Sequence, residues 1–244
     1  PRALPILFAT ELWERFGFYS LLSIFTIYLT SKLGMSDGEA FLLFGVYTAF
    51  AYLTPAIGGI AADRVLGSGP SILLGAALMS AGYVVLAAGG LDAIYLGLAV
   101  LILGNGFFKA NVSALLGQFY GDDDPRRTAG FTLFYMGINV GGLAGGLIAG
   151  VVAQEFGYTE AFLMAGAGKA IAFATYLLGR RHLEKKDVAP IAPRENTRGL
   201  VAVALGCAAV TAGVFFLLSR PQIAGTVLGV AGGLIVAGYI VLVL

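Results

Sequence analysis

Residues 10–19 read TELWERFGFY and place three charged side chains, Glu11, Glu14 and Arg15, inside an apolar run from Leu4 to Tyr28. A helix of about 20 apolar residues spans the hydrocarbon core of a bilayer. The run is therefore long enough to cross a membrane. The three charges within it need partners or water to offset the cost of leaving an aqueous environment.

The whole chain has the composition of an integral membrane protein. Of its 244 residues, 58% are hydrophobic and 12% are charged, and the mean hydropathy is +0.87. Soluble domains carry about twice that share of charge. The apolar runs are continuous rather than alternating, which predicts helices and not a β-barrel. We expect an all-α membrane protein with helices over residues 4–30, 39–62, 71–90, 93–119, 128–153, 159–180, 199–218 and 222–244.

The lysines and arginines between these helices are distributed unevenly. Lys32 and Arg220 fall on one side of the membrane. The other side receives Arg2, Arg64, Arg126, Arg127, Arg180, Arg181, Lys185, Lys186, Arg194 and Arg198. The positive-inside rule then predicts a cytoplasmic N-terminus. Residues 181–198 become a cytoplasmic linker that divides a six-helix unit, residues 1–180, from a final helix pair, residues 199–244.

The first predicted helix gathers its polar side chains on one face. At 100° per residue this face contains Glu11, Glu14, Arg15, Phe18, Tyr19 and Leu22. Each central charge costs about 2.5 to 3.5 kcal/mol in a membrane, so we expect the face to line a hydrated cavity. Glu11 and Arg15 form a favourable i, i+4 pair, which leaves the second acid to carry a proton. The alternative is an inert buried ion pair that fixes helix packing.

Two lysines lie within predicted spans. Lys109 belongs to GNGFFKANVS, residues 104–113, whose glycine spacing does not match a phosphate loop. We expect Lys109 to pair with the acids of the first helix or to bind an anionic substrate group, with snorkelling to the interface as the alternative. Lys169 has no evident acid partner. It either snorkels or forms an ion pair that the sequence does not reveal.

The predicted fifth helix reads FTLFYMGINVGGLAGGLIAG over residues 131–150. Tyr135 and Asn139 are four residues apart and share a face, and Asn139 is the better candidate for binding. Overlapping G-x-x-x-G pairs predict close helix packing. They are formed by Gly141, Gly142, Gly145, Gly146 and Gly150.

Enzymatic function finds no support in the sequence. The single histidine, His182, falls in the linker, and neither H-E-x-x-H nor G-x-S-x-G occurs. We expect no catalytic residues, no metal and no nucleic-acid partner. A non-transporting membrane sensor subunit remains an alternative.

Three motifs carry a resemblance to a known family. TELWERF resembles the E-x-x-E-R-F element of the proton-dependent oligopeptide transporters, a branch of the major facilitator superfamily. GNGFFKANVS resembles that family's fourth-helix lysine motif, and FTLFYMGINVGGL its fifth-helix signature. Residues 59–67, GIAADRVLG, are similar to the superfamily's loop between helices two and three.

The resemblance implies proton-coupled uptake of di- and tripeptides by two six-helix bundles that rock about a central site. This chain would be the N-terminal bundle with two inserted helices, the second bundle would be absent from it, and a C-terminal bundle would be its required partner. Protons would be the coupling ion, with no cofactor, and the protein would lie in the bacterial inner membrane. The implied proton-coupling residues are Glu11, Glu14, Arg15 and Lys109. The implied substrate-binding residues are Arg15, Tyr19, Tyr52, Lys109, Tyr135 and Asn139, and the implied gating loop contains Gly59, Asp63 and Arg64.

The sequence also departs from the family pattern. Phe18 stands where the family commonly has a tyrosine, Leu22 where many members have arginine or glutamine, and Ala110 where the lysine motif usually continues with proline. Without a charge at position 22, carboxylate binding would depend more on Lys109 and Arg15. A different small anionic or zwitterionic substrate is therefore an alternative to peptides.

Overall fold

The computed structural model describes residues 3–121, 123–183 and 197–243, and these residues form helices and turns without any strand. The long helices are α1 (Ala3–Ser31), α2 (Asp37–Ala61), α3 (Ser68–Ala87), α4 (Leu91–Gln118), α5 (Arg127–Glu155), α6 (Tyr158–Gly179), α7 (Thr197–Leu218) and α8 (Pro221–Val243). The all-α prediction is confirmed, and each helix ends within three residues of its predicted limits. Most of the predicted linker lies outside the described residues.

Six of the described helices, α2 to α7, are long and apolar enough to cross a membrane. The 29-residue α1 has the length to do so but carries Glu11, Glu14 and Arg15 in its first half. The protein is therefore a multi-pass membrane protein. Its three charged residues in α1 therefore lie in a bundle of membrane-spanning helices.

Short turns with glycine at positive φ separate several of the helices. Gly67, at φ 84°, ends the helix that precedes α3, and Gly157, at φ 117°, separates α5 from α6. Only glycine adopts such angles without steric cost. The structure starts α3 at Ser68, earlier than predicted, because Pro70 falls in the first turn, where a missing N–H costs no hydrogen bond.

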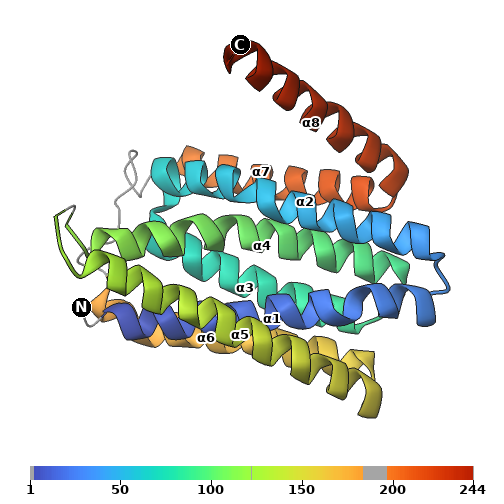
Figure 1. The fold of residues 1–244 in the computed structure, drawn as a ribbon, viewed down its shortest axis with the longest axis horizontal. Helices are drawn as coiled ribbons and strands as arrows, with labels where there is room; N and C mark the ends of the chain where they lie inside the picture. Colours follow the sequence, from blue (N-terminus) through green and yellow to red (C-terminus); the bar gives the residue numbers. More distant parts are fainter. Residues whose placement is uncertain (1–2, 122, 184–196, 244) are drawn as a thin grey trace.

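The main contacts among the first six helices follow the same pattern for α1–α3 as for α4–α6. α1 packs against α5 and α6, α4 packs against α2 and α3, and α3 packs against α6. If α1, α2 and α3 are exchanged with α4, α5 and α6 in order, each of these contacts is replaced by another contact of the same set. This correspondence is expected for a structural repeat. The six helices form one bundle with α1 and α4 as its most connected members (Figure 1).

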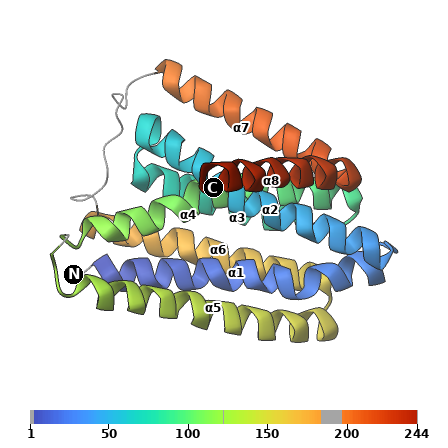
Figure 2. The same cartoon turned by 45° about the horizontal axis from the view of Figure 1, so that its top comes forward.

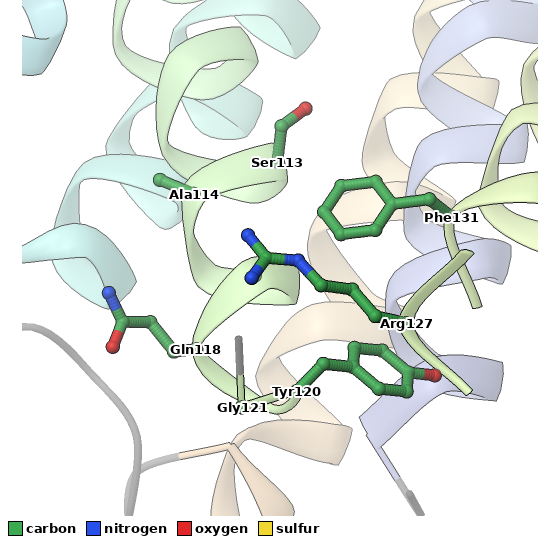
Figure 3. Close-up of a pocket in the computed structure, with 8 residues that line it drawn as sticks. Ser113, Ala114, Gln118, Tyr120, Gly121, Arg127 and Phe131 are labelled. Carbon is green, nitrogen blue, oxygen red and sulfur yellow. The ribbon is translucent and has the colours of Figure 1, made fainter. Parts of the chain in front are cut away.

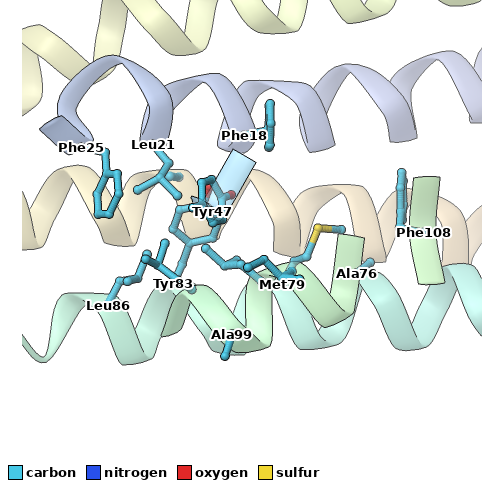
Figure 4. Packing of buried hydrophobic residues seen from close by; sticks show 14 of the residues in the cluster. Phe18, Leu21, Phe25, Tyr47, Ala76, Met79, Tyr83, Leu86, Ala99 and Phe108 are labelled. Atoms are coloured by element: carbon cyan, nitrogen blue, oxygen red, sulfur yellow. The ribbon is translucent and has the colours of Figure 1, made fainter. Parts of the chain in front are cut away.

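Aromatic and aliphatic side chains fill the bundle between α1, α2, α3 and α4. Leu21 and Phe25 extend from α1 toward Tyr47 and Tyr83 (Figure 4). The rings of Phe25 and Tyr47 lie with their centroids 6.2 Å apart. This packing holds the second half of α1 firmly and so fixes the position of the charged first half.

The last two helices lie on one side of the bundle. α7 packs against α4 and α2, and the rings of Tyr95 and Phe215 meet edge to face at 6.2 Å. α8 contacts α2 and runs obliquely to α7 (Figures 1 and 2). Both helices stand apart from the charged cluster.

Candidate functional site

Four charged side chains form a cluster between α1 and α6. Glu11, Glu14 and Arg15 of α1 are 3%, 0% and 3% exposed, and Lys169 of α6 is 1% exposed. We call these four residues the charge tetrad. Two acids and two cations balance each other, which is the condition under which charges are tolerated away from water.

Arg15 holds both acids of α1. Its Nε atom lies 3.2 Å from Glu11 Oε1, and it also donates a hydrogen bond to Glu14 Oε2. The i, i+4 pair between Glu11 and Arg15 that the sequence predicts is confirmed. Arg15 is therefore the cation that the two carboxylates share.

Lys169 completes the tetrad from the neighbouring helix. Its Nζ atom donates to Glu14 Oε1 at 2.6 Å and to the Glu14 carbonyl oxygen at 2.7 Å. The sequence left two alternatives for Lys169, snorkelling to the membrane surface or an ion pair. The structure contains the ion pair, with Glu14. Charge-assisted hydrogen bonds of this length are among the strongest in proteins.

Glycines let α1 and α6 approach closely enough for this contact. A Cβ atom on Gly17 would lie 2.9 Å from Lys169 Cε, and one on Gly168 would lie 2.8 Å from a ring carbon of Phe16. Phe16 in turn packs edge-on against Trp13, with 5.5 Å between ring centroids. Tyr83 of α3 donates a hydrogen bond of 2.5 Å to the Gly17 carbonyl oxygen. Three helices therefore hold the tetrad in place.

Two polar atoms in the tetrad have no hydrogen-bond partner. They are Oε2 of Glu11 and Nη2 of Arg15, and both are buried. Both oxygens of Glu14, in contrast, are bonded to cations. Buried polar groups are usually satisfied, so exceptions call for a functional explanation. Glu11 is therefore the acid of the tetrad that keeps an unbonded acceptor.

The expectation that the charged residues of α1 line an open cavity is wrong for this structure. Glu11, Glu14 and Arg15 are enclosed, because α6 covers them through its close glycine contacts. Phe18 covers them as well, with the Arg15 guanidinium 4.8 Å from its ring centroid. Tyr19, from the same predicted face, is 37% exposed.

Lys109 does not join the tetrad. Its Nζ atom lies 4.3 Å from the centroid of the Tyr52 ring, and within the described residues it forms no ion pair. The predicted pairing of Lys109 with the acids of the first helix is thus wrong in this structure, since Lys169 occupies the place beside Glu14. Lys109 still lies within electrostatic range of Glu11 and Glu14.

The remaining predicted binding residues are on exposed parts of neighbouring helices. Tyr52 of α2 is 61% exposed and Tyr135 of α5 is 55% exposed, and Asn139 is exposed one turn further along α5. Tyr19 lies against α5, since a Cβ atom on Gly142 would be 2.9 Å from its ring. These side chains are free to contact a ligand or another part of a protein.

The glycines of α5 divide into two sets. A Cβ atom on Gly141 would lie 2.1 Å from the Leu12 carbonyl oxygen, and one on Gly145 would lie 2.2 Å from that of Phe16. Close packing of α5 on α1 is therefore confirmed for this pair. Gly146 and Gly150 have no atom within 4 Å of such a Cβ and form no part of the contact.

The segment expected as a gating loop is helical. Gly59 lies within α2, while Asp63 and Arg64 lie in η1 (Ala62–Leu66), a π-helical turn that continues α2 and ends at Gly67. The loop prediction is wrong because none of these residues requires a turn before Gly67. Asp63 and Arg64 are exposed at the end of this helix.

The glycines of the predicted lysine motif contact two different helices. Gly104 faces α3 at Gly75 and Met79, and Gly106 faces α2 at Thr54, with closest Cβ distances of 2.7 and 2.9 Å. Between them, Asn105 donates a 2.6 Å hydrogen bond to the Ala51 carbonyl oxygen. α4 remains one continuous helix through this motif.

Residues 70–218 match the sequence pattern of the POT family (PTR2). The chain belongs to the POT family. A dipeptide and tripeptide permease A from Cronobacter turicensis is 39% identical over 94% of this chain and 46% of its own length. The protein of the same name from Escherichia coli is 36% identical over 97% of this chain and 48% of its own length. The chain thus spans about half the length of these curated relatives.

Solved structures of POT-family proteins share the fold. A bacterial homologue of the human drug peptide transporters PepT1 and PepT2 superposes with a TM-score of 0.89 at 28% identity, over 98% of this chain and 54% of the other. A peptide transporter POT in complex with sulfate superposes with a TM-score of 0.83 at 30% identity, over 99% and 52%. The resemblance drawn from the three motifs is confirmed.

The position of Lys169 within its helix is a signal in the sequence for the ion pair that the structure contains. Lys169 lies at the middle of α6, 11 residues from Tyr158 and 10 from Gly179. At 1.5 Å per residue, either membrane surface is about 15 Å away, beyond the reach of a lysine stem. A lysine at this depth predicts a buried acid partner.

A separate cavity of about 490 Å³ lies where α4 ends and α5 begins. Arg127 extends from the start of α5 toward α4, between Tyr120 and Phe131 (Figure 3). The polar lining includes Ser113 and Gln118.

This POT-family chain has no group of three His, Cys, Asp or Glu residues, within its described ranges, that could hold a metal ion.

Proposed function

We propose that this chain is the N-terminal half of a proton-coupled symporter that carries di- and tripeptides into the cytoplasm. Relatives that match 94% or more of the chain are named dipeptide and tripeptide permeases. The relatives are about twice as long as the chain, which supports a C-terminal bundle as the partner required for transport. Alternating access needs two units that move about a shared site.

The buried tetrad is the observation that carries proton coupling. Glu11 lies in a membrane-spanning bundle, with one oxygen in an ion pair with Arg15 and the other without a partner. An ionisable group held at this depth is costly unless it serves a purpose. We propose that Glu11, Glu14 and Arg15 form the proton-coupling cluster and that Lys109 acts on it electrostatically.

Peptide binding is proposed for the polar side chains around Lys109. A peptide presents a carboxylate and an ammonium group, so its site needs a cation and hydrogen-bonding groups. The candidates come from α1, α2, α4 and α5 and are Arg15, Tyr19, Tyr52, Lys109, Tyr135 and Asn139. Four of them, Tyr19, Tyr52, Tyr135 and Asn139, are exposed in this chain. A C-terminal bundle placed against them would enclose the site.

The proposed topology follows the distribution of basic residues. We propose that the N-terminus, the linker at residues 181–198 and the end of α2 face the cytoplasm of a bacterial cell. Gly59, Asp63 and Arg64 would then act at the cytoplasmic gate. Residues 1–180 would form the transporting bundle, and residues 199–244 an inserted helix pair outside the transport path.

Uptake in proteoliposomes that contain the native polypeptide tests this proposal. An inward proton gradient should drive accumulation of a labelled dipeptide, and Glu11→Gln should abolish it while largely retaining counterflow exchange, which moves no net proton. Glu155→Gln, at an exposed position at the end of α5, is the matched control. Gradient-driven accumulation by the Glu11→Gln variant would overturn the coupling role.

The alternative substrate is another small anion or zwitterion, and Leu22 is the residue that favours it. Leu22 is apolar, whereas the resemblance to the family implies a charged or amide side chain at this position in many members. Competition of labelled dipeptide uptake by single amino acids, nitrate and anionic drugs separates the two. Inhibition by dipeptides alone supports peptide transport. If the native polypeptide moves none of these compounds, the sensor interpretation gains support.

A further inference from the structure

We propose that Lys169 is a positioning residue of the proton cycle, which holds Glu14 ionised so that Glu11 is the acid that takes up and releases the proton. This inference rests on the proposed symport. It concerns a residue on α6, outside the E-x-x-E-R-F motif that suggested the coupling cluster. The two acids of the tetrad differ in how many of their oxygens are bonded to cations.

Glu14 is fully committed to cations. One of its oxygens accepts from Arg15 and the other accepts from Lys169 at 2.6 Å. Lys169 is further fixed by the Glu14 carbonyl oxygen at 2.7 Å. A proton on Glu14 would have to displace one of these two contacts.

Glu11 is committed on one side only. Its Oε1 atom lies 3.2 Å from Arg15 Nε, and its Oε2 atom is buried without a partner. A proton can therefore be added at Oε2 without displacing any contact of the tetrad. The unpartnered Nη2 atom of Arg15 lies in the same cluster and can take part in the rearrangement that follows.

The Lys169 stem fits closely against Gly17, so its contact with Glu14 is fixed by the packing of α6 on α1. Its stem passes Gly17 so closely that a Cβ there would be 2.9 Å from Cε and 3.2 Å from Cδ. The contact thus requires both a lysine on α6 and a glycine on α1. Phe18 lies beside the two cations, with Lys169 Nζ 6.0 Å and the Arg15 guanidinium 4.8 Å from its ring centroid.

The titratable surroundings of the tetrad come from each neighbouring helix. Tyr47 of α2 and Tyr83 of α3 lie within electrostatic range of Glu14, as does Lys109 of α4. α5 contributes a single titratable side chain between Thr128 and Ala153, that of Tyr135, which is exposed. On α1, Tyr19 lies within electrostatic range of Arg15. The titratable side chains of α6 are those of Tyr158, Glu160, Lys169 and Tyr176. Lys169 is the only basic residue among the described residues of this helix, Tyr158–Gly179, and it balances the second acid.

Removal of Lys169 gives a specific prediction for proton binding. In Lys169→Met two acids share one cation, and the cluster becomes neutral only by holding an additional proton. We expect the pH profile of dipeptide uptake to move toward higher pH by about one to three units, the usual effect of one neighbouring charge. Glu14→Gln combined with Lys169→Met removes an acid and a cation together and should restore the profile. Lys169→Arg, which keeps the charge, should leave the profile in place even if the rate falls.

Infrared spectroscopy of the carboxyl groups tests the same inference without any substrate. In the ligand-free native polypeptide, the band of the titrating protonated carboxyl should be lost in Glu11→Gln and retained in the double variant Glu14→Gln/Lys169→Met. Lys169→Met should show one additional protonated carboxyl at neutral pH. This readout stands even if peptides are not the substrate, so failure of the proposed function and failure of this inference are distinguishable.

Two results would overturn the inference. One is an unchanged pH profile and carboxyl spectrum in a folded Lys169→Met protein, which would make Lys169 purely structural. The other is a titrating band that survives Glu11→Gln and disappears in the double variant, which would assign the proton to Glu14. If Lys169→Met does not fold, the comparison of Glu11→Gln with the double variant still decides between these outcomes.

Discussion

Gly17 of α1 and Lys169 of α6 fit against each other so closely that the glycine cannot carry a side chain. A Cβ atom at Gly17 would lie 2.7 Å from the Ala165 carbonyl oxygen and 2.9 Å from Lys169 Cε. The pair joins the motif-bearing helix to the helix that supplies its second cation. Helix packing and charge placement therefore depend on the same residue.

Gly17→Ala should destabilise the bundle by about 1 to 3 kcal/mol, the usual cost of overpacking. It should also disturb the contact between Lys169 and Glu14, because the lysine stem has to move. Thermal unfolding in detergent measures the first effect. Gly45→Ala in α2 is the control, since nothing lies within 4 Å of its added Cβ. Equal melting temperatures for the two variants would contradict the prediction.

Gly141→Ala should be more damaging than Gly17→Ala. The added methyl group would lie 2.1 Å from the Leu12 carbonyl oxygen, a more severe clash with backbone than the 2.7 Å approach of a Gly17 methyl group to the Ala165 carbonyl oxygen. We expect α5 to separate from α1, with a loss of more than about 3 kcal/mol. The yield of monodisperse protein after mild heating measures this loss. Gly146→Ala, five residues further along and in open space, should behave like the wild type.

Tyr52 should protect Lys109 from chemical modification. The lysine Nζ atom lies 4.3 Å from the Tyr52 ring centroid, and a contact of this kind contributes about 0.5 to 1 kcal/mol at exposed sites. Tyr52→Leu should therefore raise the rate of Lys109 labelling by an amine-reactive reagent about two- to fivefold. Tyr52→Phe keeps the aromatic face and should label at the wild-type rate. Faster labelling in both variants would show that the hydroxyl group, and not the ring, protects the lysine.

Asp124 should stabilise the turn between α4 and α5 in a pH-dependent way. Hydrogen bonds from the Arg126 side chain and backbone lower the pKa of Asp124 to about 2. An aspartate in an unfolded chain has a pKa of about 3.9. Because the folded pKa is the lower one, the contribution is complete above about pH 4 and is lost as the pH falls through about 2.

The comparison of wild type with Asp124→Asn measures this contribution. Their melting temperatures should differ by a constant amount at neutral and mildly acidic pH and converge as the pH approaches 2. Arg126→Gln removes the donor side chain, so the effect of Asp124→Asn on the melting temperature should be smaller in this background. A difference that persists unchanged to the lowest pH would exclude the ion pair as its cause.

Most of the fold could be predicted because membrane helices are specified locally. Apolar length sets each span, and glycines such as Gly67 and Gly157 set the ends, so eight helices emerge from the sequence without knowledge of their neighbours. The end of α2 was less predictable. A segment without a residue that favours a turn can be loop or helix, and here the helix continues as a π-helical turn to Leu66.

The charged site could be predicted only in part, since its partners come from different helices. Helical spacing places Glu11 beside Arg15 and so predicts their pair correctly. It contains no information on whether Lys109 of α4 or Lys169 of α6 reaches Glu14. That choice depends on the packing of α6 against α1 through Gly17 and Gly168, which only the three-dimensional structure supplies.

The position of Trp13 gives the cluster a built-in optical probe. It is the single tryptophan of this chain, it lies between Glu11 and Glu14 in sequence, and it packs against Phe16 on the helix that carries both acids. Indole emission responds to nearby charge and polarity. Fluorescence of this chain should therefore report a change in the charge of Glu11 or Glu14 without any attached dye.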